Sequence, residues 1–262
     1  MRKHLKIFAC YFRLNLASAL EYRAGFFSQA FGMALSNSSF IFFWWIAFGQ
    51  IGGAIAGYTF EDVLFIWAAT STGFGMSYVL FANVANLSSL IVTGELDTFI
   101  LQPCNTLLNV LCAKTNLAAY GDFAYGFVIM SLFYWGNLAS WLWFLFSALL
   151  TCLLITAVNL AACTLTFYWG ETSLIRQLAV EFTINFSIYP EKIYAPAIRA
   201  LMYSLIPAGI AIHVPLRLFR QFTPAAALAA LGAIALYCTL AGLFFYRGLR
   251  RYESGNAIVT RL

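Results

Sequence analysis

The sequence predicts an all-α integral membrane protein, folded as a single transmembrane domain over residues 1–262. The chain is 62% hydrophobic and only 10% charged, whereas soluble domains are about 45–50% apolar and about 25% charged. The apolar tracts are continuous rather than alternating, which favours membrane-spanning helices over a β-barrel. Four tracts contain no Asp, Glu, Lys or Arg: 24–60, 63–94, 123–170 and 221–246.

A helical span needs about 20 apolar residues, and the sequence accommodates six. The turn-forming stretch Trp135–Asn137 separates the third span from the fourth. The third expected span contains Lys114 and Asp122, and the fifth contains Arg176 and Glu181. Embedded charges usually face the bundle interior, so these two spans should be the less lipid-exposed. The expected spans are 25–48, 62–86, 113–135, 139–166, 171–189 and 224–247.

Residues 1–23 combine basic and apolar positions at helical spacing, which predicts an amphipathic helix in the headgroup region. An ordinary cytoplasmic lead-in to the first span would have the same composition. Lys and Arg gather in this segment and in the tail 247–261. The positive-inside rule therefore places both termini in the cytoplasm.

The region 189–223 interrupts the pattern of spans. It is apolar, yet it holds four prolines and four basic residues. Proline breaks helices, and the orientation above puts this region outside the cell. We therefore predict a pair of short re-entrant helices that dip into the outer leaflet and return. The alternative is a seventh span over 198–216, which would put the basic C-terminal tail outside, against the charge rule.

The chain lacks the motifs of several enzyme classes. It has no G-x-x-x-x-G-K-[ST] loop, which indicates that it has no ATPase activity of its own. His4 and His213 lie far apart, and the six cysteines form no C-x-x-C pair, so reduced, mostly buried thiols are expected. We predict no catalytic residue, no metal site and no cofactor bound by this chain. The net charge of +5 is explained by membrane topology rather than by nucleic-acid binding.

A short polar segment, GELDTFILQPCNTLL, follows the second span at Gly94–Leu108. Acids near the N-terminus of a short helix are stabilised by the helix dipole. Ile100, Leu101 and Leu107 supply apolar side chains that suit the groove of a partner protein. The plain alternative is a solvated turn between two spans, capped by acids.

Taken in order, four features resemble the membrane permease of type-2 ATP-binding-cassette (ABC) exporters. They are the amphipathic N-terminus, GELDTFILQPCNTLL, the stretch YPEKIYAP…IPAG…P, and the basic tail GLRRYESGN. The resemblance covers essentially the whole chain, and it is to the bacterial branch of six-span permeases whose ATPase is a separate chain. It implies that two permeases, identical or paralogous, pair around a pathway in the inner membrane. Two ATPase subunits, which bind ATP and Mg²⁺, would dock beneath them and drive export.

The resemblance also implies roles for particular residues. The region 90–108 would be the coupling helix that sits in a groove of the ATPase, and the N-terminal helix would share that contact. The region 189–223 would close the pathway from outside. The residues that form or flank the ATPase contact would be Gly94, Glu95, Leu96, Asp97, Leu101 and Pro103, with Arg13, Glu21 and Arg23 near it.

Polar residues within the spans are candidates for the transport pathway or its gate. Asp122 and Glu181 come first because charge in hydrocarbon is costly, although interhelical hydrogen bonding is as common a use of such residues. Two other functions stay open, an ion-coupled secondary transporter and an integral membrane enzyme that modifies lipids. The candidates are Asp122, Asn159, Glu181, Tyr194 and Pro207, with Asn37, Asn83 and Asn86 as further polar positions.

Overall fold

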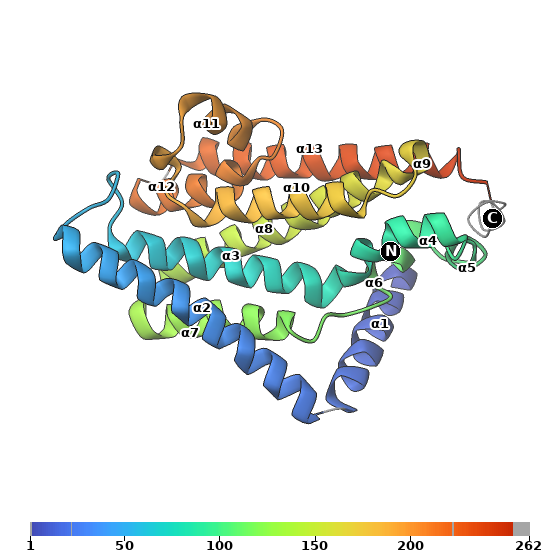
Figure 1. Ribbon diagram of the computed structural model, residues 1–262, viewed down its shortest axis with the longest axis horizontal. Helices are drawn as coiled ribbons and strands as arrows, with labels where there is room; N and C mark the ends of the chain where they lie inside the picture. The colour runs from blue at the N-terminus through green and yellow to red at the C-terminus, as the bar shows by residue number, and fades with distance from the viewer. Residues whose placement is uncertain (1, 22, 222, 254–262) are drawn as a thin grey trace.

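The computed structural model describes residues 2–21, 23–221 and 223–253. Its regular structure is helical, and the one β-type pairing in these ranges is an isolated bridge between Ile55 and Tyr58. Figure 1 shows α3, α8, α10 and α13 along the long axis, with α2 crossing them at an angle. In chain order the elements are α1 (Arg2–Glu21), α2 (Arg23–Ile51), α3 (Phe60–Phe81), the 3₁₀-helix η1 (Ala82–Asn86), α4 (Leu87–Thr93), α5 (Asp97–Ile100), α6 (Thr106–Cys112), α7 (Ala119–Phe133), α8 (Leu138–Thr164), α9 (Thr166–Trp169), α10 (Ser173–Ile188), the 3₁₀-helix η2 (Glu191–Ile193), α11 (Pro196–Tyr203), the π-helix η3 (Gly209–His213), α12 (Val214–Arg220) and α13 (Pro224–Leu249).

Four helical stretches in the described ranges are long and apolar enough to cross a membrane. They are 23–51, 60–93, 138–169 and 224–249, with 29, 34, 32 and 26 residues. The second stretch joins α3, η1 and α4, and the third joins α8 and α9. Each overlaps a predicted span, and the predicted turn at Trp135–Asn137 is confirmed because α7 ends at Phe133 and α8 begins at Leu138.

The other two predicted spans are shorter than expected. α7 has 15 residues and α10 has 16, so they are about 22 and 24 Å long, less than the roughly 30 Å of hydrocarbon. The expected start of the third span at 113 is wrong. Thr115 donates to the Val79 carbonyl of α3 (3.0 Å), and Asn116 accepts from the Ala118 amide (3.0 Å), a local bond of the kind that competes with helix formation. Lys114 therefore precedes α7 and is exposed.

Helices α3 and α8 form the centre of the bundle. In the most apolar part of the α8 stretch 72% of the residues are buried, against 17% in α2 and 22% in α13. α7, α10, η3 and α13 pack around this centre. The main apolar cluster joins Phe65 and Ile66 of α3 to Leu150 and Leu154 of α8. The outer faces of α2 and α13 are left for lipid or for a second protein.

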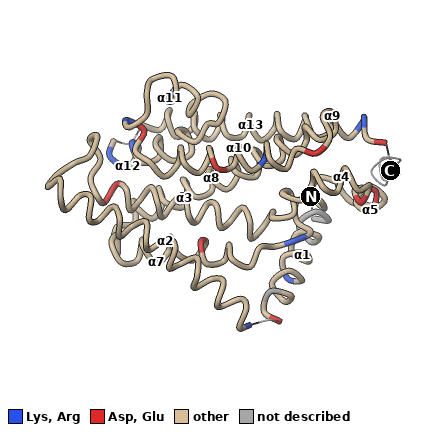
Figure 2. The backbone as a smooth tube through the Cα atoms, in the orientation of Figure 1, with Lys and Arg blue, Asp and Glu red and all other residues tan. Residues whose placement is uncertain are grey.

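The bundle has two distinct ends in Figure 1. The α5 end carries α4, α5, α6 and α9, and the α11 end carries α11, α12 and the loop before α3. Figure 2 shows no charged residue along most of α3, α8 and α13. In 189–221 the helices have only three to eight residues. Short helices were predicted there, and the alternative of a seventh span over 198–216 is wrong.

Candidate functional site

The segment 94–105 at the α5 end folds back onto the bundle. Gly94 ends α4 with φ +78°, a left-handed conformation that glycine adopts at low cost. The Leu96 amide then donates to the Leu90 carbonyl (3.0 Å), and the Leu96 side chain is 0% exposed. It packs in an apolar cluster with Leu87 and Ile91. The segment is therefore anchored to the bundle and is not a loose turn.

The same segment also presents side chains outward. Leu101 is 85% exposed, Ile100 is 38% exposed, and Glu95 and Pro103 are exposed. The expected coupling helix over 90–108 is divided into α4, α5 and α6, and α5 is a single turn of four residues. The result is a small apolar projection beside an acid, held by a short rigid loop.

Contacts with α13 and the chain after it hold the segment from the side. The side chains of Asn105 and Tyr246 hydrogen-bond each other at 2.7 and 3.0 Å. Burial and the nearby Asp97 carboxylate raise the pKa of Tyr252 to about 12. Sequence reasoning missed both contacts because the partners lie more than a hundred residues apart and follow no motif.

Helix α1 meets this end of the bundle with its N-terminal part. The rings of Phe8 and Phe81 lie 6.3 Å apart, and the Asn15 amide donates to the Cys112 carbonyl (3.0 Å). Arg13 is exposed on α1. The C-terminal end of α1 and the start of α2 lie away from α5 in Figure 1, so Glu21 and Arg23, which were expected near the ATPase contact, lie apart from the segment.

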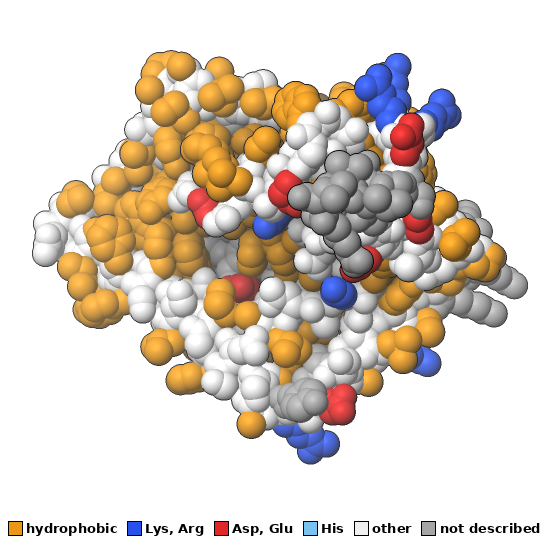
Figure 3. Space-filling model, turned by 45° about the vertical axis from the view of Figure 1, so that its right-hand side comes forward, with side chains coloured by type: hydrophobic (Ala, Val, Ile, Leu, Met, Phe, Trp, Pro, Cys, Tyr) orange, Lys and Arg blue, Asp and Glu red, His pale blue; other side chains and the backbone are white. Residues whose placement is uncertain are grey.

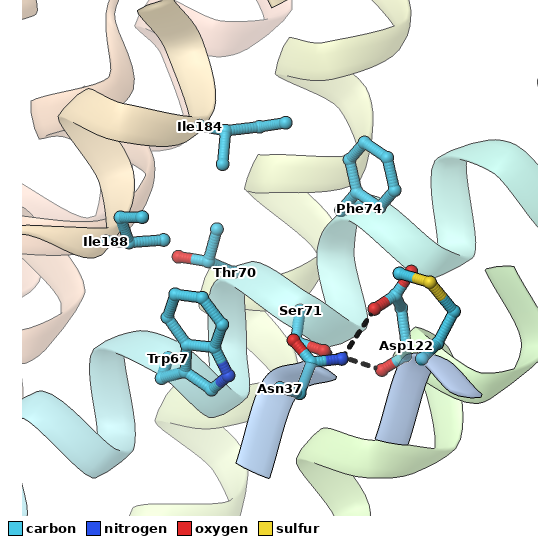
Figure 4. A pocket seen from close by; sticks show the side chains of 9 residues that line it. Asn37, Trp67, Thr70, Ser71, Phe74, Asp122, Ile184 and Ile188 are labelled. Carbon is cyan, nitrogen blue, oxygen red and sulfur yellow. Dashed lines mark hydrogen bonds between the residues drawn. The ribbon is translucent and has the colours of Figure 1, made fainter. Parts of the chain in front are cut away.

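A cavity of about 210 Å³ lies between α2, α3, α7 and α10. Figure 4 shows its polar base, where Asp122 meets Asn37, and its aromatic and aliphatic walls. Asp122, in the first turn of α7, is 4% exposed. Its Oδ1 accepts a hydrogen bond from Asn37 Nδ2 (2.7 Å). The lining residues are Met33, Asn37, Trp67, Thr70, Ser71, Phe74, Asp122, Ile184 and Ile188.

Close packing of α7 on α3 fixes the position of Asp122. Ser71 donates to the Asp122 carbonyl (2.9 Å), and Thr72 donates to the Phe123 carbonyl (3.2 Å). A Cβ added at Gly75 would lie 2.6 Å from Cα of Phe123, so only glycine fits at this crossing. Small residues that let helix backbones approach and hydroxyls that bond across the gap are typical of helix packing in membranes.

The remaining candidate pathway residues do not line this cavity. Asn159 is fully buried in α8 and donates to a carbonyl four residues earlier (2.9 Å). Glu181 is exposed on α10. Tyr194 and Pro207 belong to the α11 end. The structure thus brings Asp122 together with Asn37, and it places Asn159, Glu181, Tyr194 and Pro207 outside this cavity.

An ion pair closes the α11 end. The Asp62 carboxylate bonds the Thr59 backbone and side chain at the start of α3 (2.7 and 2.9 Å) and pairs with Arg220 of α12. Within the described ranges, no group of three or more His, Cys, Asp or Glu residues could hold a metal ion. All six cysteines are free, and three of them are buried.

Comparison with known proteins identifies the family. The sequence model described as "ABC-2 family transporter protein" matches residues 35–256, which is most of the chain. No curated protein matches the sequence significantly. The match confirms the resemblance to ABC permeases, and it sets aside an enzymatic role. The chain belongs to the ABC-2 family of transporter membrane proteins, whose permeases are multi-pass membrane proteins without an ATPase domain.

Proposed function

We propose that this chain is the permease subunit of an ABC exporter in a bacterial cytoplasmic membrane. It pairs with a second permease, identical or paralogous, and with two ATPase subunits that bind ATP and Mg²⁺. Family membership supports the permease role. Because the chain has no phosphate-binding loop, work must reach it through a protein surface. In this arrangement the α5 end and both termini face the cytoplasm.

The observation that carries the proposal is the contrast between Leu96 and Leu101. Leu96 is enclosed in the apolar cluster that joins η1, α4, α6, α8 and α13, whereas Leu101, five residues later, is 85% exposed. A groove on the ATPase that covers Leu101 would therefore grip the segment, and Leu96 would carry its displacement into the packed helices. Packed interiors transmit strain because they have little free volume.

Exposed apolar faces support the pairing with a second permease. Phe27, Phe31 and Leu35 of α2 are 60% exposed or more. On α10, Leu174 and Phe182 are also more than half exposed. A second permease that covers these faces would enclose the side on which the cavity lies.

Co-purification with the ATPase tests the proposal. Glu95→Lys should abolish or strongly weaken the capture of the permease by a tagged ATPase, and ATP-dependent transport should fall with it. Glu61→Lys is the matched control, because Glu61 is an exposed acid at the opposite end of the bundle. Equal capture of both variants would refute the assignment of the α5 end as the ATPase contact.

The buried Asp122 favours a second candidate, an ion-coupled secondary transporter. A carboxylate at mid-bundle, hydrogen-bonded by one amide, is a suitable proton site. The two functions differ in their energy source. Transport that continues when the phosphate-loop lysine of the ATPase is replaced, and that stops when the proton gradient is dissipated, would establish the secondary transporter.

A further inference from the structure

We propose that the cavity between α2, α3, α7 and α10 binds a hydrophobic organic cation, with Asp122 as its counterion and Trp67 and Phe74 against its charged group. This inference rests on the proposed transport function, because it names the class of cargo. It uses residues that the coupling assignment does not involve.

Asp122 is a buried acid without a cationic partner in the described part of the chain. Asp122 is 4% exposed, and its single side-chain hydrogen bond comes from the neutral amide of Asn37. In the described part of the chain no Lys, Arg or His nitrogen lies within 4.0 Å of this carboxylate. By contrast, Asp62 is also buried and has Arg220. A buried carboxylate is costly unless it is paired, and a bound cation would supply the missing charge.

The second argument is the chemistry of the cavity walls. Figure 4 shows Trp67 and Phe74 on the same cavity as Asp122, with Ile184 and Ile188 on the opposite side. Trp is the side chain whose face attracts cations best, and aromatic walls are typical of sites for quaternary ammonium groups. An inorganic cation would need several oxygen ligands that converge on one point, whereas the Ser71 hydroxyl is already bonded to the Asp122 carbonyl and the Thr70 hydroxyl is directed toward the isoleucine side. The walls therefore favour an organic cation.

Two buried polar atoms of the cavity residues have no hydrogen-bond partner in the described structure. Thr70 is 3% exposed and lines the cavity, yet its Oγ1 has no hydrogen-bond partner in the described structure. Nε1 of Trp67 is also buried without a partner. Buried polar atoms nearly always have partners, so both groups are available to a ligand. Figure 4 shows the Thr70 hydroxyl directed toward the isoleucine side of the cavity.

The size of the cavity limits what it holds. A volume of about 210 Å³ is below the roughly 300–1,000 Å³ of pockets that enclose drug-sized ligands. It therefore accommodates a cationic head with one ring, and the remainder of a larger molecule would extend outside. Figure 3 shows a hollow on this side of the molecule, bordered mainly by hydrophobic side chains, with an acidic side chain at its edge. An amphipathic cargo fits this arrangement.

Three probes of matched shape separate charge from hydrophobicity. Benzyltrimethylammonium, benzyl methyl sulfone and benzylsulfonate share a benzyl group and a tetrahedral head, and they are cationic, neutral and anionic. Calorimetric titration of the full-length chain in detergent, with empty micelles as the blank, measures their affinities. We expect the wild-type chain to bind the cation about tenfold or more tightly than the neutral sulfone and to bind the sulfonate most weakly.

Substitutions then locate the charge preference. Asp122→Asn should remove most of the preference for the cation and leave sulfone binding unchanged, and Asp122→Glu should retain the preference. Glu181→Gln is the matched control, since Glu181 is an acid on α10 that does not line the cavity.

The proposal is overturned if the wild-type chain binds the sulfone as tightly as the cation, or binds none of the probes. It is also overturned if folded Asp122→Asn keeps the full preference. The wild-type comparison decides the matter even where a variant does not fold. Capture by the ATPase is a separate readout, so a wild-type chain that shows no preference for the cation but is captured normally refutes the cation site and leaves the permease assignment in place.

Discussion

The crossing of α3 and α7 gives the sharpest prediction on stability. A Cβ added at Gly75 would lie 2.6 Å from Cα of Phe123 and 2.7 Å from the Ala119 carbonyl oxygen, where ordinary contacts are 3.4–4 Å. Both neighbours are backbone atoms, so no side chain can rotate away. The nearest atom is the backbone nitrogen of Phe123, so in Gly75→Ala the two helices would have to separate by about 1.2 Å to restore an ordinary contact.

The energy of this change follows from opposing terms. Overpacking a tight contact costs about 1–3 kcal/mol, and the upper value applies because the clash is with backbone. Replacing a helical glycine with alanine stabilises the helix by about 0.5–1 kcal/mol, which offsets part of this cost. We therefore expect Gly75→Ala to lower the free energy of unfolding by about 2 kcal/mol, which lowers Tm by about 4–8 °C.

Gly232→Ala on α13 is the matched control. Nothing lies within 4 Å of a Cβ at Gly232, so this variant keeps only the favourable helix term and should melt at or slightly above the wild-type temperature. A thiol-reactive fluorogenic dye follows both, because Cys112, Cys152 and Cys163 are buried and react on unfolding. Equal melting temperatures for the two variants would show that α3 and α7 are not in backbone contact.

Four other substitutions test the two ends of the bundle. Leu101→Ala should weaken ATPase association about 10- to 100-fold without changing Tm, because it removes one exposed leucine that would enter a groove; a pull-down titration measures the affinity. Leu96→Ala, which removes a buried leucine, should instead lower Tm. Arg220→Met should lower the free energy of unfolding, measured by denaturant titration, by about 1 kcal/mol. It removes the half-exposed cationic partner of Asp62 and leaves that carboxylate unpaired; unchanged stability would contradict this. Lys192→Cys places a thiol at an exposed position, and it should react with a membrane-impermeant maleimide added outside cells. Labelling only after permeabilisation would show that the proposed orientation is wrong.

The long apolar helices were predictable from sequence because their signal is local. A charge-free tract of more than 20 residues has few structures available to it in a membrane. α2, α8 and α13 therefore lie close to their predicted ranges. α10 (Ser173–Ile188) also lies close to its predicted range 171–189, whereas α7 begins at Ala119 and not at 113. Side-chain bonds of Thr115 and Asn116 precede the start of α7, and the Thr115 bond depends on Val79 of α3, a neighbour that a sequence pattern does not show.

The residues of the cavity were also only partly predictable from the sequence. Asp122 stood out in the sequence because a charge in a span is rare. Its partner Asn37 lies 85 positions earlier, and it was one of several polar candidates of equal standing. Trp67 and Phe74 gave no signal, because aromatic residues occur throughout a chain that is 18% aromatic. Only the packing of α2, α3, α7 and α10 places these four side chains on one cavity.

Helix α3 connects the cavity to the proposed ATPase contact. Trp67, Ser71 and Phe74 line the cavity from α3, and the same helical stretch continues through η1 and α4 to the 94–105 segment. The α-helical geometry of this stretch is interrupted at η1, where Asn83 is fully buried and donates to the Val110 carbonyl of α6 (2.8 Å). A 3₁₀ turn within a helix is a common place for a hinge. Under the proposed function, a push on the 94–105 segment would reach α3 through η1, which the Asn83 bond ties to α6, and a change in the tilt of α3 would move the cavity wall that faces Asp122.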